Sequence, residues 1–286
     1  DVGGKIVTPG FIASDTEIGI VEIGALDVTR DDESNISSIG FSIHDAFNPN
    51  STLIPWNRAN GITSAITLPR NTSSPLGGLG SFFVLDSNLK ISSEPDMVMI
   101  GRIGGSSSSS RAEMLSLTDD ILAFAFSISS SDMKTNLDID ALIDSSSIAN
   151  FLELKARDVK ALHKLINKKM PIIIKSNRAS DILKLIEMKK KYDLNLIIMG
   201  AQEASLVADQ LAGSKIPLIV NPINNIPNSF DELASNINLS SRLEDEGILL
   251  MFNASRDHNY HLIRQGAGIA VANGMSYGGA IKALSS

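Results

Sequence analysis

The sequence contains no cysteine and only four histidines. The absence of cysteine excludes disulfides, thiolate metal sites and a cysteine nucleophile. Four scattered histidines are too few for a conventional catalytic site. No run approaches the roughly 18 consecutive apolar residues of a membrane-spanning helix, so we expect a soluble chain without a membrane partner, in either periplasm or cytoplasm. The net charge of −7, without a basic stripe, argues against a nucleic-acid partner.

Short apolar runs recur along the chain and predict buried β-strands. Because the runs are continuous instead of alternating, they are typical of parallel strands that helices cover on both faces. They span residues 5–13, 62–69, 81–86, 96–101, 171–176, 195–200, 216–221 and 247–253. Helical spacing of apolar residues marks segments 156–169, 178–192, 202–213 and 229–247. This alternation predicts right-handed βαβ units, in an open doubly wound sheet or in a closed barrel.

The remaining segments are expected to be loops. Residues 14–51 and 101–150 show no clear pattern, and the serine run after residue 105 predicts a mobile segment. Long loops after strands are where barrel enzymes hold their functional residues. No glycine fingerprint follows the first strand, which disfavours a dinucleotide-binding fold. Since α/β barrels of about 250 residues form one unit, residues 1–286 are predicted to form a single domain.

Four segments carry a resemblance to a known family. They are "GKIVTPGFIAS" (4–14), "NGITSAITLP" (60–69), "PIIIKSNRASDILKLIEMKKKYDLNLIIMG" (171–200) and "GILLMFNASRDHNYHLIRQGAGIAVANGMSYGGAIKALS" (247–285). In this order they resemble the imidazolonepropionase-like branch of the amidohydrolase superfamily. The resemblance implies a distorted (β/α)8 TIM barrel over the whole chain. It also implies that the family's small β-sandwich is absent from this chain, which we expect to be part of something longer.

The family's metal-binding positions carry other residues here. Where the family has a His-x-His pair after the first strand, this chain has Asp15 and Glu17. Lys175 replaces the fifth-strand histidine, with Asn177 two places later, and Gly200 replaces the sixth-strand histidine. The family's eighth-strand aspartate, a metal ligand and general base, corresponds to Ser255, or to Asp257 after a small shift in alignment.

These replacements imply that the zinc or other divalent metal of the family has lost its ligands, so no metal or other cofactor is expected. Asp15 and Glu17 stay open between a site for a harder cation such as Mg²⁺ and an acidic solvated loop. The later carboxylates, including Asp32, are expected to be solvated. An unpaired ammonium inside a barrel is costly, and we therefore expect Lys175 to form a salt bridge with Asp15 or Glu17 at the former metal position.

Other residues have structural alternatives. His258 and His261, three residues apart, are predicted to share a helix face with a metal or substrate role, while Asp257 could instead cap that helix. We expect His163 to lie half-exposed on an outer helix and His44 to lie in a turn. Trp56 is predicted to pack on the helix before the second strand. "PLGGLG" (75–80) indicates close backbone approach.

Two functions follow as hypotheses. The first is an amidohydrolase-like enzyme that hydrolyses a C–N bond of the cyclic amide type in a small molecule, with Asp257, His258 and Lys175 as the catalytic candidates. The second is a catalytically degenerate barrel that binds a small molecule or a protein, with Asp15, Glu17, Asn177, Gly200 and Ser255 lining its pocket. Whether catalysis survives, and whether the chain forms a homo-oligomer, stay open.

Overall fold

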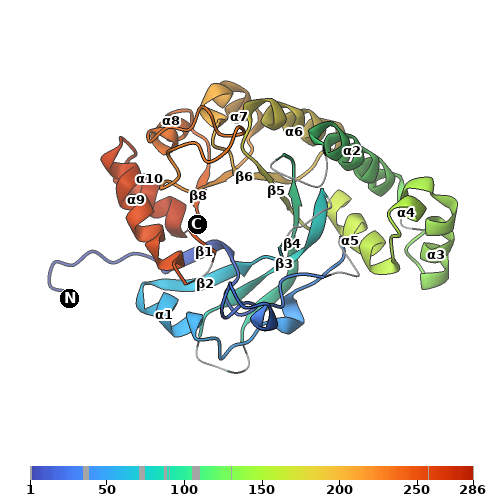
Figure 1. The fold of residues 1–286 in the computed structure, drawn as a ribbon, viewed down its shortest axis with the longest axis horizontal. Helices are drawn as coiled ribbons and strands as arrows, with labels where there is room; N and C mark the ends of the chain where they lie inside the picture. Colours follow the sequence, from blue (N-terminus) through green and yellow to red (C-terminus); the bar gives the residue numbers. More distant parts are fainter. Residues whose placement is uncertain are drawn as a thin grey trace.

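The computed structural model describes residues 2–34, 39–70, 75–86, 89, 91–104, 110–129, 131–256 and 258–285. One sheet of eight strands, in the order β1 to β8, curves into a barrel, and helices surround it (Figure 1). The strands are β1 (Phe11–Thr16), β2 (Ile62–Thr67), β3 (Leu76–Val84), β4 (Ser93–Arg102), β5 (Ile172–Ser176), β6 (Leu196–Gly200), β7 (Leu218–Val220) and β8 (Leu250–Phe252). The predicted α/β barrel is confirmed, and each predicted apolar run contains or overlaps a strand.

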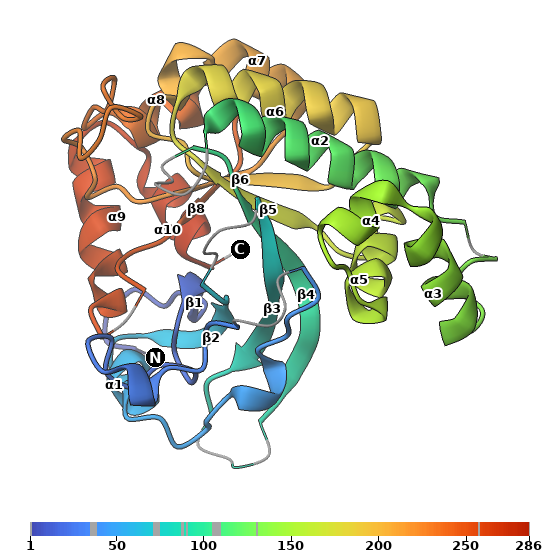
Figure 2. The ribbon, with the colours of Figure 1, turned by 45° about the vertical axis from the view of Figure 1, so that its right-hand side comes forward.

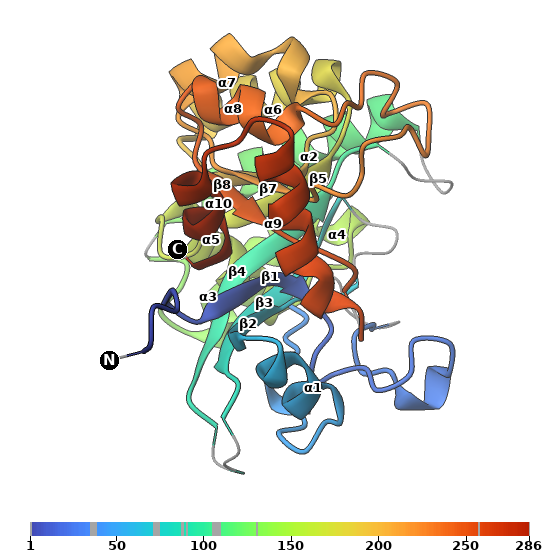
Figure 3. The ribbon, with the colours of Figure 1, turned by 90° about the vertical axis from the view of Figure 1, so that its left-hand side faces the viewer.

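One strand contradicts the prediction that the whole sheet is built of parallel βαβ units. β3 pairs antiparallel with both β2 and β4, and Figure 3 shows β3 and β4 side by side as a long hairpin. The physical reason is the length of the connections: residues 68–75 and 85–92 are shorter than the dozen or more residues of a parallel crossover. The predicted close approach at 75–80 is present, because a Cβ on Gly80 would lie 2.3 Å from Leu68 Cδ2.

The longer helices cover the outside of the barrel (Figure 2). The helices are α1 (Leu53–Ala59), α2 (Arg111–Ser127), α3 (Asn136–Ser145), α4 (Ser147–Phe151), α5 (Ala156–Ile166), α6 (Ala179–Tyr192), α7 (Ala208–Ser214), α8 (Leu239–Asp245), α9 (Ile263–Ala272) and α10 (Tyr277–Ser285). The prediction of a long irregular segment at 101–150 was wrong, because α2, α3 and α4 lie there. Its serine run falls largely outside the described residues. In the described part of the chain, no helix combines the length and apolar character needed to cross a membrane.

The predicted helices at 202–213 and 229–247 are shorter than expected. α7 and α8 occupy only their C-terminal parts, and between β7 and α8 the chain forms a long loop, residues 221–238. Several apolar side chains of this loop are exposed, so burial does not drive the predicted helix there. The loop lies at the carboxyl end of β7, where a barrel keeps its functional loops.

An apolar layer fills the inside of the barrel. It consists of inward-facing side chains from β2 and β4 to β8, with their neighbours: Ile66, Leu68, Met97, Val98, Ile100, Ile173, Ile197, Met199, Ile219 and Met251. A larger core lies between the sheet and the helices. The barrel is therefore a packed core, and its carboxyl end, above this apolar layer, is where such barrels hold their functional residues.

The barrel seam between β8 and β1 is closed by side chains. Within the described residues these two strands form no ladder, but Ser14 Oγ donates to the Phe252 carbonyl at 2.8 Å. The hydroxyl of Tyr260, whose side chain is fully buried, accepts hydrogen bonds from Ser14 N at 2.8 Å and Asp15 N at 3.3 Å. The seam therefore places Asp15 directly beside the segment that follows β8.

Candidate functional site

A polar layer lies directly above the apolar layer of the barrel. Side chains on a strand alternate between its two faces, so residues two apart point the same way. Most inward apolar residues near the carboxyl end are followed two positions later by a polar one, as Ile100 is by Arg102 and Ile173 by Lys175. Leu68 and Arg70, Ile219 and Asn221, and Met251 and Asn253 repeat this pattern. The sequence at the strand ends thus places a polar layer at the carboxyl end of the barrel, above the apolar layer. We call this polar end the mouth of the barrel.

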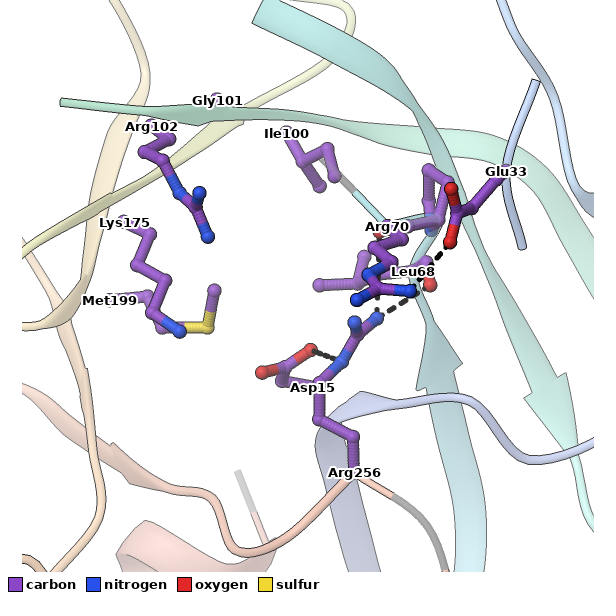
Figure 4. A pocket seen from close by; sticks show the side chains of 11 residues that line it. Asp15, Glu33, Leu68, Arg70, Ile100, Gly101, Arg102, Lys175, Met199 and Arg256 are labelled. Carbon is purple, nitrogen blue, oxygen red and sulfur yellow. Dashed lines mark hydrogen bonds and ion pairs between the residues drawn. The ribbon is translucent and has the colours of Figure 1, made fainter. Parts of the chain in front are cut away.

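Three adjoining cavities occupy this mouth, with volumes of about 440, 470 and 230 Å³. Lys175 lines all three, and Asp15 and Arg256 line the first two (Figure 4). The first cavity is lined mainly by charged side chains, with four cations and two carboxylates: Asp15, Glu33, Arg70, Arg102, Lys175 and Arg256. Six amide side chains line the second cavity, together with Asp15, Lys175, Glu232 and Arg256. The mouth therefore offers room and polar contacts for a small molecule.

Arg256 neutralises two carboxylates, those of Asp15 and Glu17. Its Nε lies 2.8 Å from Asp15 Oδ1 and its Nη1 lies 3.0 Å from Glu17 Oε1. Its Nη2 also donates to the Leu68 carbonyl at 2.7 Å. Burial by itself would lower the pKa of the guanidinium, but the carboxylates of Asp15, Glu17 and Asp32 outweigh it and raise that pKa. Arg256 is therefore a fixed cation beside the end of β1.

Glu17 and Asp32 form the second half of this charge cluster. Both are buried, and Arg30 Nη2 lies 2.6 Å from Asp32 Oδ2 and 3.7 Å from Glu17 Oε1. The expectation that Asp32 is solvated was wrong, because Arg30 folds back over it. Burial raises the pKa of Glu17, and Arg256 opposes that rise. The carboxylates after β1 thus belong to an internal ion-pair network, which leaves them little freedom to bind a cation.

The predicted salt bridge of Lys175 was wrong. Among described residues, no carboxylate oxygen lies within 4.0 Å of its Nζ, because Asp15 pairs with Arg256 instead. The Lys175 side chain remains accessible in the cavity, yet the surrounding barrel wall desolvates it and lowers its pKa. The Asp15 carboxylate opposes this shift, and the neighbouring Arg102 adds to it. Lys175 is thus a cation held in the mouth without a close counter-ion from the described chain.

Asn177 and Gly200 form one local unit on the amide side. Gly200 has φ +93°, and a Cβ on it would lie only 2.3 Å from Asn177 Oδ1. The missing side chain therefore makes room for Asn177, whose Nδ2 donates to Glu232 Oε1 at 2.6 Å. Glu232 comes from the β7–α8 loop, so this contact also joins that loop to the mouth.

The remaining predicted site residues are less central. Ser255 is exposed and lines the second cavity. Asp257 lies outside the described residues. His258 is exposed in a turn and lines none of the three mouth cavities. His258 and His261 do not share an α-helix face, because a turn and the short 3-10 helix Tyr260–Leu262 replace the expected helix.

The structural positions predicted for His163 and His44 are confirmed. His163 is half-buried on α5, and His44 lies in a 3-10 turn, residues His44–Ala46. Trp56 lies on α1, as predicted, but it packs at the surface: it is 54% exposed, its ring contacts the ring of His261, and its Nε1 donates to His261 Nδ1 at 3.2 Å.

The donor set at the mouth does not fit the family's metal. Among the residues that the structure describes, no three His, Asp or Glu side chains gather in a group that could hold a metal ion. Asp15 and Glu17 are both held by Arg256, and Lys175 would place a positive charge next to the ion. A divalent cation would have to displace a guanidinium from a buried ion pair.

Three cationic residues of the mouth were missed as site residues in the sequence: Arg70, Arg102 and Arg256. A local signal existed for two of them, because Arg70 and Arg102 each follow an apolar strand run within one or two residues. Arg256 carries no such signal, since it contacts Asp15 only through the closure of the seam.

Tyr260→Phe provides a test of the seam. We expect this change to lower the free energy of unfolding by about 1–3 kcal/mol, because two buried backbone amides lose their acceptor. Urea denaturation of the two proteins measures this difference. Tyr277→Phe, at a half-exposed tyrosine on α10, is the control and should leave stability unchanged. Equal loss in both variants would contradict a role for the seam.

No protein-family model and no curated protein match this chain. Among solved structures, the chain is similar to the crystal structure of an amidohydrolase from Thermotoga maritima, with a TM-score of 0.76 and 20% sequence identity. The match covers 99% of this chain and 77% of the other. At this identity the similarity establishes the fold alone, and it agrees with the barrel described above.

Proposed function

We propose that this barrel binds a small molecule in its mouth without the metal of the hydrolases it resembles. We also propose that its ancestry lies in the imidazolonepropionase-like branch of the amidohydrolase superfamily, on the strength of the sequence resemblance. The observation that carries the functional proposal is the position of Arg256, which pairs with Asp15 and Glu17 where the family holds its metal. Cavities of about 440 and 470 Å³ beside this cluster supply the binding space.

Lys175 supports a second candidate, hydrolysis of a C–N bond with an altered site. Its lowered pKa makes a neutral amine more accessible, and a neutral amine in a cavity can act as a general base. Hydrolysis of a cyclic amide such as hydantoin would support this candidate if Lys175→Met reduced it by about 100-fold or more, the contribution typical of a general base. No turnover, or turnover that Lys175→Met leaves intact, would favour binding alone.

Metal analysis tests the first candidate. We expect protein purified without chelators to contain no stoichiometric Zn, Mn or Fe, because the carboxylates at the metal position are already neutralised. We also expect the same Tm in EDTA as with added Zn²⁺ or Mn²⁺. A stoichiometric metal together with a metal-dependent rise in Tm would overturn the proposal, since only binding to the folded state stabilises it.

A further inference from the structure

Two like charges lie side by side at the mouth. Arg102 ends β4, Lys175 lies one residue before the end of β5, and the two are paired in register across these parallel strands. Both side chains point into the same cavity (Figure 4). Like charges on directly neighbouring strand positions are destabilising. This pair therefore costs stability unless a negative group lies between or beside them.

The chain itself supplies no such group within ion-pair distance. Arg70 pairs with Glu33 at 2.6 Å and Arg256 with Asp15 at 2.8 Å, so both carboxylates of the first cavity are taken. Among described residues, no carboxylate oxygen lies within 4.0 Å of the charged nitrogens of Arg102 or Lys175. The first cavity thus keeps an excess of positive charge, although the chain as a whole carries −7.

The second cavity adjoins the first, and Asp15, Lys175 and Arg256 line both. Asn177, Gln202 and Asn253 also line the second cavity, but their side-chain oxygens are buried and have almost no surface open to it. Because Lys175 lines both cavities, a molecule bound beside it can extend from the charged first cavity into the second.

We propose that the mouth binds a small organic oxyanion, with its carboxylate or phosphate group between Arg102 and Lys175 and with the rest of the molecule extending into the second cavity. The guanidinium of Arg102 matches the planar spacing of oxyanion oxygens, and Lys175 adds a point charge. Together they occupy the fifth-strand side of the mouth, opposite the Arg256 cluster. This proposal rests on the proposed function and specifies the chemistry of its ligand.

Thermal unfolding with two simple anions tests the charged half. The probes are inorganic phosphate and malonate, each compared with NaCl at equal ionic strength. At about ten times Kd, we expect the effective anion to raise the Tm of the native chain by roughly 2–5 °C, by binding only the folded state. The anion with the larger shift distinguishes a phosphate from a carboxylate ligand.

Variants connect the shift to the two cations. In Arg102→Met/Lys175→Met we expect the shift to disappear, while the Tm in NaCl alone stays equal or rises because the like-charge contact is gone. Arg102→Lys keeps the charge but loses the planar guanidinium, so it should keep part of the shift. Lys184→Met/Arg242→Met removes one lysine and one arginine from exposed positions on α6 and α8 and should respond to anions like the native chain.

The outcomes separate this proposal from the one it rests on. If neither anion shifts the native Tm, or if the Arg102→Met/Lys175→Met variant keeps the full shift, the anion site is wrong. A glucose-induced Tm shift that is equal in the native chain and in Arg102→Met/Lys175→Met would overturn the proposal that the ligand is an anion, while the proposal of small-molecule binding would stand. Bound metal in the purified protein would instead overturn the metal-free function.

Discussion

Arg256→Met is expected to lower the free energy of unfolding by about 3–5 kcal/mol, the cost typical of removing one partner from a buried ion pair. Asp15 and Glu17 are 6% and 9% exposed, and Arg256 is the cation nearest to both. The variant also loses the hydrogen bond to the Leu68 carbonyl, which joins the segment after β8 to the end of β2. Urea denaturation at pH 8 measures the loss.

The loss should depend on pH through Glu17. Burial already raises the pKa of Glu17 in the folded native protein, and removal of Arg256 raises it further. A carboxyl whose folded pKa lies above its unfolded value favours the folded state below the unfolded pKa, and this contribution is lost as the pH rises through the folded pKa. We therefore expect the difference in free energy of unfolding between the native and Arg256→Met proteins to become smaller from pH 8 towards pH 5.

A charge-free cluster is the control for Arg256→Met. Asp15→Asn/Glu17→Gln/Arg256→Met removes all three charges at once, and replacing a buried ion cluster by neutral groups is often close to neutral in stability. We expect this variant to recover most of the 3–5 kcal/mol lost by Arg256→Met. If it is as unstable as Arg256→Met alone, packing of the Arg256 stem decides stability and the charge argument fails.

Arg111→Met is expected to have the second largest effect, a loss of about 2–4 kcal/mol, because it leaves the buried Asp181 without its cation. Arg111, at the start of α2, lies 2.8 Å from Asp181 on α6 and 2.6 Å from Asp231 in the β7–α8 loop. Asp181 is 2% exposed. The same guanidinium thus joins two helices of the outer layer to the loop that carries Glu232 into the mouth.

Two measurements separate stability from loop anchoring in Arg111→Met. Hydrogen exchange should become faster in residues 221–238 than in α5, since the loop loses one of its ion pairs. Arg178→Met is the matched control: Arg178 contacts Asp231 at 2.8 Å but is more exposed, and Arg111 remains on Asp231. We expect this control to cost less than about 1 kcal/mol, as partly exposed ion pairs do. A loss in the control equal to that in Arg111→Met would contradict the role of Asp181.

The sequence predicted much of the frame because the relevant signals are local. Continuous apolar runs identified all eight strands, and helical spacing identified α5 and α6 closely. It failed at α2, where serine and threonine dilute the apolar pattern, and at residues 221–238, where apolar residues at helical spacing lie exposed in a loop. It also missed the reversed direction of β3, although the short connections on both sides of that strand were visible.

The sequence by itself determined the α/β succession of strands and helices and the step from apolar to polar residues at the strand ends, since both depend on neighbours a few positions apart. The closed barrel was expected only from the family resemblance. Only the tertiary structure decided which charges meet. Lys175 was the expected partner of Asp15, but the closed seam brings Arg256 to Asp15 from the far end of the chain and leaves Lys175 beside Arg102. Coulombic pairing depends on distance in space, and no local pattern encodes that distance.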